Sequence, residues 1–235
     1  ADASEFNYEK KKELFTSVKY MTIVTPSKWL AGLVKESFLG KYEVIVINNG
    51  IDLDVFKPTE SDFREKYGLQ DKKIILGVAS VWTERKGVNT FIELSEKLDD
   101  NFKIILVGVN KKQKSMLPKN VIGITRTNNV KELAEIYTVA DVFVNPTLEE
   151  VMGLTNVEAL ACGIPVITFD SGGSVECIDE SSGKIVTKGD IDKLIKYINE
   201  IKNMNISKEC CINRANLFNK WEKYNKYINM YLGEN

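Results

Sequence analysis

The chain has 235 residues, of which 43% are apolar and 28% charged, and its 32 basic and 33 acidic residues leave a net charge of −1. The apolar fraction is enough for a packed core, and the balanced charge gives no reason to expect binding to nucleic acid or to an anionic membrane surface. Because the chain has no histidine, a Ser-His-Asp triad, a Cys-His pair and any histidine-containing metal site are excluded, and we expect no metal.

Short apolar runs rich in isoleucine and valine alternate along the chain with segments of helical periodicity. Most of these runs are apolar at consecutive positions, which is typical of strands covered on both faces, as in a parallel sheet. The repeated strand–helix–strand pattern predicts right-handed crossovers and an α/β fold, a Rossmann-like parallel sheet with helices on both faces. The predicted strands are residues 22–24, 44–47, 74–78, 104–107, 121–124, 142–144, 166–169 and 184–186.

Several of the intervening helices have recognisable ends. Polar residues placed to cap helix N-termini are Ser27, Asn129 and Asp190. Gly40 is expected to end the first of these helices, and Glu132 stands at the third helical position after Asn129, a pair similar to a capping box. A further helix is expected over residues 88–98, and the helix after Asp190 is expected to run through Ile201.

The chain divides into three parts of different character. Residues 1–43 hold a lysine-rich helix, one strand and one helix, which is too little for a domain, so we expect the remnant of a preceding domain. Residues 44–206 are expected to form the Rossmann-like domain, and residues 207–235 to form C-terminal helices that pack back toward the N-terminal region. The last helix carries an apolar stripe that covers either its own domain's core or a missing domain. The stripe consists of Leu217, Phe218, Trp221, Tyr224, Ile228 and Tyr231.

In an open parallel sheet, ligands bind at the carboxyl ends of the strands, and two carboxylates follow the sixth predicted strand. Glu150 is expected in the loop after that strand, and Glu158 in the first turns of a helix that starts near Thr155. Such carboxylates can accept paired hydrogen bonds from vicinal sugar hydroxyls. The backbone amides of Gly153, Leu154 and Thr155 lie at the helix N-terminus, which suits a phosphate. A glutamate pair alone also fits one surface glutamate and one helix-capping glutamate, so the functional interpretation depends on the surrounding residues.

Those surrounding residues resemble the nucleotide-binding signature of retaining glycosyltransferases with the GT-B fold, family 4. The family pattern is Pro-Ser/Thr, a Glu, seven residues, Glu-Ala-x-Ala-x-Gly-x-Pro-Val-Ile, then a Gly-Gly turn and a Glu. The matching residues here are Pro146-Thr147, Glu150, residues 158–167, Gly172-Gly173 and Glu176. Further segments similar to family landmarks are residues 49–52, residues 56–58, residues 84–87 and the stretch from Asp141 to Pro146. The match covers roughly residues 44–186.

The resemblance implies the C-terminal, donor-binding domain of the enzyme. It implies that Glu158 holds the ribose hydroxyls, that Glu150 contacts the transferred sugar and that Lys86 neutralises the diphosphate. A developing pyrophosphate leaving group needs positive charge preorganised around it, which fits these residue types. The donor substrate is then a nucleotide diphosphate sugar of UDP or GDP type, and no further cofactor is implied.

The sequence departs from the family pattern at several places. Many family members carry an arginine at the end of the strand before the lysine, whereas residues 78–82 here contain none. Either Arg85 compensates, or Lys86 and backbone amides hold the phosphates alone. Arg126 follows the fifth predicted strand and either stacks on the base, reaches a phosphate or is a solvated surface residue. Glu149 competes with Glu150 for the sugar, and only the spacing favours Glu150.

The leading interpretation is the donor-binding domain of a glycosyltransferase in cell-envelope polysaccharide or glycoconjugate synthesis, acting with retention. Its expected partners are the nucleotide-sugar donor and a glycan or lipid-linked acceptor held by a missing N-terminal acceptor domain. We therefore expect the chain alone to have little transferase activity. The alternatives are a GT-B-fold sugar-nucleotide epimerase, a glycan phosphorylase, and a non-catalytic nucleotide-binding or regulatory α/β domain.

The remaining signals concern the compartment. The cysteines form no C-x-x-C pair and are expected to be free thiols in a reducing environment: Cys162, Cys177, Cys210 and Cys211. The first residues have no apolar run of signal-peptide length, and no run of about 18 apolar residues occurs. We therefore expect a cytoplasmic protein with at most peripheral membrane association.

Overall fold

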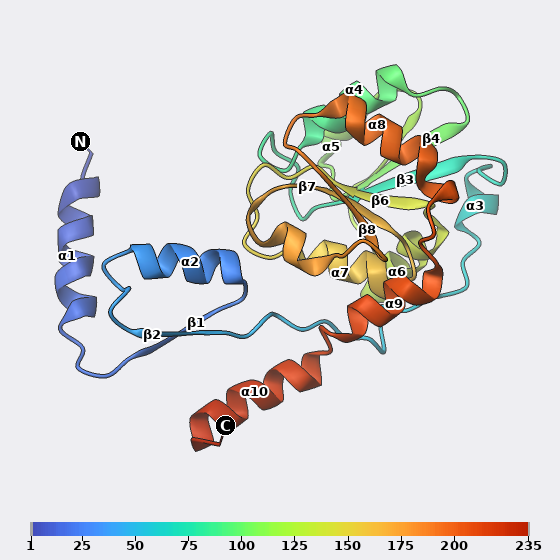
Figure 1. Cartoon of the computed structure of the whole chain (residues 1–235). Coiled ribbons are helices and arrows are strands. Elements are labelled where there is room, and N and C mark those ends of the chain that lie inside the picture. Colours follow the sequence, from blue (N-terminus) through green and yellow to red (C-terminus); the bar gives the residue numbers. More distant parts are fainter. Residues whose placement is uncertain (1, 235) are drawn as a thin grey trace.

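The computed structural model describes residues 2–234, and a six-stranded parallel sheet forms its centre (Figure 1). The strands are β3 (Lys73–Val78), β4 (Phe102–Val107), β5 (Val121–Ile124), β6 (Val142–Asn145), β7 (Val166–Phe169) and β8 (Gly183–Val186). Their spatial order is β5-β4-β3-β6-β7-β8, and every neighbouring pair is parallel. The order reverses between β3 and β6, so the sheet is doubly wound. The expected fold class is confirmed.

The strands have consecutive apolar residues because each face of the sheet is buried in a separate core. In β4, Ile105 belongs to one apolar cluster while Ile104 and Leu106 belong to the other. In β3, Ile74 and Ile75 alternate in the same way, and both are fully buried. Because successive side chains of a strand point to opposite faces, a sheet covered on both sides needs apolar residues at every position.

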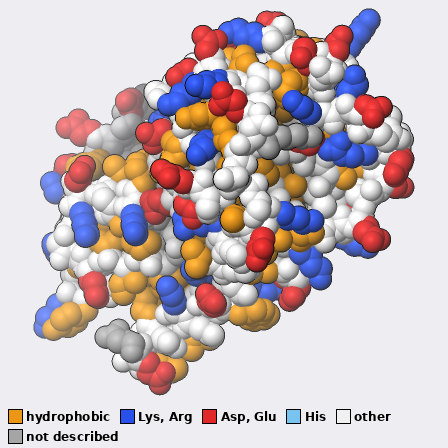
Figure 2. All heavy atoms as spheres, turned by 45° about the vertical axis from the view of Figure 1, so that its right-hand side comes forward, with side chains coloured by type: hydrophobic (Ala, Val, Ile, Leu, Met, Phe, Trp, Pro, Cys, Tyr) orange, Lys and Arg blue, Asp and Glu red, His pale blue; other side chains and the backbone are white. Residues whose placement is uncertain are grey.

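Helices cover both faces of the sheet (Figure 1). One face is covered by α4 (Val88–Lys97), α5 (Lys111–Met116) and α8 (Ile191–Glu200). The other face is covered by α6 (Val130–Val139), α7 (Leu154–Ala161) and α9 (Lys208–Asn216), with the short α3 (Phe63–Lys66) beside α6. The 3₁₀ turns η1 (Gly172–Cys177) and η2 (Ile201–Asn203) follow β7 and α8. Acidic and basic side chains are interspersed on the surface that Figure 2 shows, in keeping with the balanced charge.

The N-terminal part forms a small sheet of its own. It contains α1 (Ser4–Thr16), β1 (Thr22–Thr25), α2 (Lys28–Glu36) and β2 (Glu43–Val46). The strand β2, which we expected to open the Rossmann-like domain at residue 44, pairs in parallel with β1 instead. The six-stranded sheet therefore begins at β3, and the assignment of this one strand is corrected. Its apolar run fits either sheet, and only the pairing decides between them.

The last helix, α10 (Lys220–Leu232), starts beside the segment that follows β2. The amide of Ile51 donates to the carbonyl of Phe218 at 2.9 Å, and the amide of Lys220 donates to the carbonyl of Ile51 at 3.0 Å. From there α10 runs past β1 and β2 in Figure 1. Of the apolar stripe only Phe218 is buried, whereas Trp221 is 59% and Tyr231 79% exposed. The stripe therefore does not cover the core of the Rossmann-like sheet beyond Phe218.

The expected helix caps are confirmed. The capping side chains accept from backbone amides three residues ahead: Ser27 from Leu30, Asn129 from Glu132, and Asp190 from Lys193. The capping box is incomplete, because the Glu132 carboxylate accepts from the amide of Asn128 rather than from that of Asn129. The helix α2 ends at Glu36, before Gly40, with Ser37 in an extended conformation.

The cysteines are free thiols, and those at positions 162, 177 and 211 are buried. Burial raises the pKa of the Cys162, Cys177 and Cys211 thiols to about 12. These groups are therefore protonated at neutral pH and behave as small apolar side chains. Within residues 2–234, no helix has the length and apolar character needed to cross a membrane.

Candidate functional site

The candidate site lies beyond the carboxyl ends of β3 and β6, where the strand order reverses. The loops that follow these two strands touch one another. The amide of Leu148, after β6, donates to the carbonyl of Arg85, after β3, at 2.8 Å. Gly87 makes the approach possible, because its φ is +80° and a Cβ atom there would lie 2.4 Å from the carbonyl oxygen of Pro146. The topology and this glycine thus bring the two predicted loops together.

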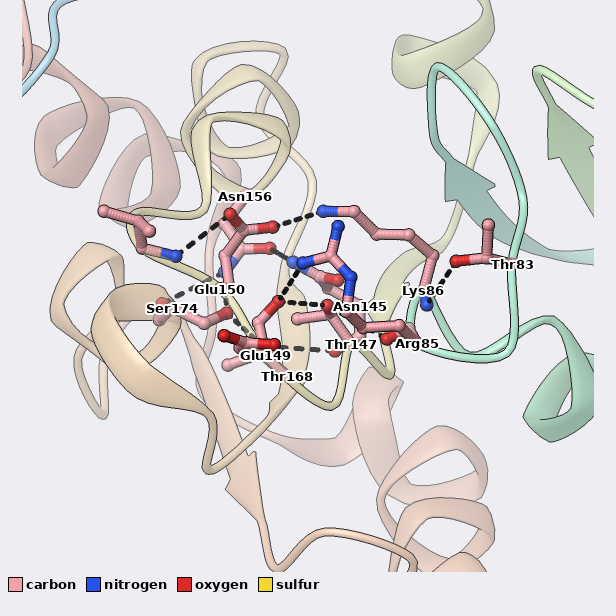
Figure 3. Close-up of polar contacts among 11 residues, drawn as sticks. Thr83, Arg85, Lys86, Asn145, Thr147, Glu149, Glu150, Asn156, Thr168 and Ser174 are labelled. Atoms are coloured by element: carbon pink, nitrogen blue, oxygen red, sulfur yellow. Dashed lines mark hydrogen bonds and ion pairs between the residues drawn. The ribbon is translucent and has the colours of Figure 1, made fainter. Parts of the chain in front are cut away.

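Lys86 and Glu150 form an ion pair across these loops (Figure 3). The Lys86 ammonium lies 2.6 Å from a Glu150 carboxylate oxygen, and the side chains are only 28% and 20% exposed. The other Glu150 oxygen accepts from the amide of Val151 at 3.2 Å. Charge-assisted hydrogen bonds between partly buried side chains are strong and directional. A phosphate that binds between these loops would therefore compete with Glu150 for the lysine.

Glu149 and Arg85 lie at the exposed edge of the same loops. The Arg85 guanidinium reaches the backbone carbonyl of Glu149 at 3.5 Å, a long hydrogen bond. The Thr147 hydroxyl donates to the same carbonyl at 3.0 Å. Glu150, not Glu149, therefore faces Lys86, and the contact of Glu150 with a sugar stays a prediction.

Glu158 lies in the second turn of α7, half-buried against α6. Its carboxylate accepts a hydrogen bond of 2.8 Å from the hydroxyl of Tyr137, a fully buried residue of α6. Burial raises the pKa of Glu158 to about 7, and the hydrogen bond from Tyr137 partly opposes that rise. Glu158 can therefore change its protonation state near neutral pH.

The N-terminus of α7 differs in detail from our expectation. Gly153 is the N-cap, and α7 begins at Leu154. The Leu154 amide donates to the carbonyl of Met152 at 2.9 Å, so it is already satisfied within the loop. The Gly153 amide is directed at the buried Cys177 thiol, where it lowers the pKa that burial raises. Thr155 follows in the first turn, half-buried. Two of the three amides offered to a phosphate are thus already engaged.

Arg126 lies apart from this cluster. It follows β5, the strand at the edge of the sheet, and its side chain is exposed. Among residues 2–234 it makes no hydrogen bond or ion pair. The structure does not bring Arg126 together with Lys86 and Glu150, and its contact with a base or phosphate stays a prediction.

The turn after β7 joins the site to the N-terminal part. The amide of Gly173 donates to the carbonyl of Glu150 at 2.9 Å. A Cβ atom on Gly173 would lie 1.9 Å from the carbonyl oxygen of Val151, so no larger residue fits there. The Glu176 carboxylate accepts from the amides of Lys28 and Trp29 at 2.9 and 2.8 Å, which caps α2. The segment from Gly172 to Glu176 therefore packs against the loop between β6 and α7 that carries Glu150, here called the Glu150 loop, and holds α2 beside it.

A buried polar network lies beneath the Glu150 loop, and we did not predict it from the sequence (Figure 3). The Asn156 amide nitrogen donates to the carbonyl and the hydroxyl of Ser174, both at 3.1 Å, and its oxygen accepts from Asn145 at 2.8 Å. The hydroxyls of Ser174 and Thr168 lie 2.7 Å apart. The signal was present as polar residues within apolar runs of β6, α7 and β7. The network fastens these elements to η1 under the site.

We expect Asn156→Ala to lower the free energy of unfolding by about 2 kcal/mol, because Asn145 and Ser174 would be left as buried groups without their partner. Urea unfolding followed by circular dichroism measures this loss. Asn199→Ala on α8, where the side chain is exposed, is the matched control and should change stability by less than about 0.5 kcal/mol. A loss in Asn156→Ala no larger than in the control would contradict a stabilising role for the network.

Comparison with known sequences identifies the protein family to which the chain is similar. The family model described as "Glycosyl transferases group 1" matches residues 59–218. The chain is 28% identical over 162 residues to a processive diacylglycerol alpha-glucosyltransferase of Acholeplasma laidlawii, covering 63% of this chain and 48% of that protein. It is 25% identical over 236 residues to the capsular polysaccharide biosynthesis glycosyltransferase CapM of Staphylococcus aureus, covering 90% of this chain and 62% of that protein. The chain thus spans about half the length of the curated relatives it matches.

Solved structures show the same fold. A sucrose-phosphate synthase from Thermosynechococcus elongatus superposes with a TM-score of 0.83 at 22% identity, covering 98% of this chain and 62% of that one. HepE from Anabaena, in complex with UDP and glucose, superposes with a TM-score of 0.79 at 18% identity, covering 98% and 67%. The sheet is therefore that of a GT-B C-terminal domain. Because the family model spans more than half of the chain, and the motif around Glu150 and Glu158 resembles that of the same class, the chain belongs to the group 1 family of glycosyl transferases.

Proposed function

We propose that this chain binds the donor for a glycosyltransferase that transfers a sugar, with retention, from a nucleotide diphosphate sugar of UDP or GDP type. The observation that carries the proposal is the Lys86–Glu150 ion pair, in which the ammonium nitrogen lies 2.6 Å from a carboxylate oxygen, between the loops where the strand order reverses. A lysine and a carboxylate at this point offer one group for phosphate and one for hydroxyls. HepE, which has the same fold, is known in complex with UDP and glucose.

In this proposal each residue acts through its ordinary chemistry. Lys86 exchanges Glu150 for the diphosphate and stabilises the charge that develops on the leaving group. Glu150, released from the lysine, accepts from hydroxyls of the transferred sugar, and Glu158 accepts from the ribose hydroxyls. The amide of Thr155 and the guanidinium of Arg85 are the remaining donors near the phosphates. Arg126 is proposed to reach the base or a phosphate from the loop after β5.

The partners of the whole protein follow from the same proposal. The curated relatives include a diacylglycerol glucosyltransferase and a capsular polysaccharide glycosyltransferase. We therefore propose a glycan or lipid-linked acceptor, bound mainly by an N-terminal domain, and a role in cell-envelope polysaccharide or glycoconjugate synthesis. Location in the cytoplasm and peripheral contact with a membrane belong to this proposal as well.

A nucleotide panel tests the proposal against a non-catalytic domain that binds no nucleotide. Isothermal titration calorimetry of the chain with UDP, GDP and ADP, and with the three monophosphates, should detect binding of at least one diphosphate. Glu158→Ala should weaken that diphosphate at least about tenfold at pH 8, because one hydrogen bond to a charged group contributes about 1.5 kcal/mol or more.

Glu96→Ala is the matched control, because Glu96 is exposed on α4. Its affinity for the same nucleotide should equal that of the wild type. If no diphosphate binds, the donor-binding proposal is wrong. If a diphosphate binds and Glu158→Ala leaves its affinity unchanged, the ribose assignment alone is wrong.

A further inference from the structure

Tyr137 is a buried tyrosine that the proposed donor chemistry does not use. It lies on α6 and is among the largest fully buried side chains of the protein. Its ring packs at 78° against Phe56 and at 57° against Phe143, with centroids 6.2 and 5.5 Å away. The ring is thus held on two sides, and its hydroxyl is presented to α7. A buried hydroxyl normally satisfies a specific partner.

The partner of that hydroxyl is Glu158. The Tyr137 oxygen lies 2.8 Å from one carboxylate oxygen of Glu158. A tyrosine has one proton to donate, whereas a carboxylate has about four lone-pair positions. The hydrogen bond therefore uses one position and leaves the others of Glu158 free to accept. It also fixes the rotation of a carboxylate that a helix alone would leave mobile.

We infer that Tyr137 is a positioning residue, whose hydroxyl orients the Glu158 carboxylate and favours its ionised form so that it accepts from the vicinal hydroxyls of a ribose. The inference rests on the proposed function, because it takes the ribose as the ligand of Glu158. It adds a residue that never touches the ligand and yet sets how strongly the ribose is recognised.

Protonation makes the inference testable. Burial raises the pKa of Glu158 to about 7, and the hydrogen bond from Tyr137 lowers it. The other titratable groups nearby are the thiol of Cys162, the C-cap of α7, and Lys208 at the start of α9, whose charge reaches Cys162. Because a protonated carboxyl accepts fewer hydrogen bonds, affinity for the ribose should rise as the pH rises through about 7.

The pH dependence of folding stability is opposite to that of ribose affinity. The folded pKa of Glu158, about 7, lies above its ordinary value of 4.5. Its stabilising contribution is therefore fully present below pH 4.5 and is lost as the pH rises through about 7. Glu158 becomes better at binding ribose over the pH range in which it becomes worse for stability. The hydrogen bond from Tyr137 stabilises the ionised form of Glu158 and so reduces the stability that is lost when Glu158 ionises.

Tyr137→Phe tests the inference, because it removes the hydroxyl and keeps the ring. Calorimetry with the tighter-binding diphosphate from the panel and its 2′-deoxy form, between pH 5.5 and 8.5, should show three changes. The ribonucleotide binds about fivefold more weakly at pH 7, as for one lost hydrogen bond. The preference for ribose over deoxyribose shrinks. The midpoint of the pH dependence moves to higher pH.

A measurement without ligand reads the same hydrogen bond. In protein labelled with ¹³C at the glutamate side chains, the Glu158 resonance is assigned by its loss in Glu158→Gln, and its midpoint should rise in Tyr137→Phe. Tyr197→Phe, on α8 over the opposite face of the sheet, is the matched control and should leave that midpoint unchanged. If Tyr137→Phe does not fold, the Tyr137 hydroxyl proton is followed by NMR in the wild type, where its chemical shift should change with the same pH midpoint as the Glu158 resonance, and a shift that does not follow Glu158 would overturn the inference.

The outcomes separate the two proposals. An unchanged Glu158 midpoint and an unchanged ribose preference in folded Tyr137→Phe would overturn the role of Tyr137. If Glu158→Ala weakens nucleotide binding, while Tyr137→Phe changes neither the Glu158 midpoint nor the ribose preference, the ribose assignment stands and this inference alone fails. If Glu158→Ala has no effect on binding, the ribose assignment fails and takes this inference with it.

Discussion

Replacing Lys86 with methionine is expected to lower the affinity of the chain for a nucleoside diphosphate by about 100-fold, which corresponds to about 2.7 kcal/mol. Two effects add. The diphosphate loses a charge-assisted hydrogen bond, and Glu150 loses the ammonium that lies 2.6 Å away. An unpaired and partly buried carboxylate, whose charge is poorly screened, then repels the incoming phosphates. Methionine keeps the length of the side chain, so the loss reports charge rather than packing.

Calorimetry with the diphosphate and its monophosphate measures this effect. The monophosphate should lose much less, since Lys86 is assigned to the diphosphate. Glu150→Gln should have the opposite sign and tighten the diphosphate, because the ligand no longer competes with a carboxylate for Lys86. Lys97→Met is the matched control, since Lys97 is exposed on α4 and pairs with Glu93. The exchange of partners at Lys86 would be contradicted if Lys86→Met lost equal affinity for the diphosphate and the monophosphate. It would also be contradicted if Glu150→Gln did not bind the diphosphate more tightly.

Replacing Asp141 with alanine is expected to lower the free energy of unfolding by about 3 kcal/mol. The Asp141 carboxylate accepts from the Arg64 guanidinium at 2.8 Å and from the amide of Ile74, the buried second residue of β3, at 2.8 Å. Arg64 also donates to the carbonyls of Val139 and Lys72. Removal of the carboxylate leaves a partly buried cation without its anion and a strand amide without its partner.

Urea unfolding measures the loss, and Asp192→Ala is the matched control. Asp192 is 94% exposed and lies 3.5 Å from Lys97, so its removal should cost less than about 0.5 kcal/mol. A loss below about 1 kcal/mol in Asp141→Ala would contradict a structural role. Asp141 lies before β6, at the end of the strand away from Glu150. We therefore expect nucleotide affinity in the folded variant to stay within about twofold of the wild type.

Much of the fold could be predicted because burial on both faces leaves a local trace. Every predicted strand is present within about two residues of its expected ends, since a strand between two cores needs consecutive apolar residues. The helix caps were equally local, because Ser27, Asn129 and Asp190 bond within one turn. The exception is β2. Its apolar run is compatible with either sheet, and its partner β1 was not encoded in its own residues.

For the site, the order of strands and loops along the chain was enough to identify the residues at the carboxyl ends of the strands. The rule for parallel sheets and the family motif together located Lys86, Glu150 and Glu158, because chain order fixes which loop follows which strand. The same reasoning offered the amides before and within α7 to a phosphate. The structure shows the Leu154 amide already bonded to Met152, a local contact that spacing does not reveal.

Which of these groups are in contact could be seen only in the folded chain. Lys86 and Glu150 are 64 residues apart, and Tyr137 and Glu158 are 21 apart, yet each pair is in hydrogen-bond contact. Such contacts depend on how loops and helices from different strands pack, and no periodicity or spacing records that. The sequence therefore determined the chemical groups and the edge of the sheet that carries them. Packing determined the ion pair between Lys86 and Glu150, and it determined the burial that raises the pKa of Glu158 to about 7.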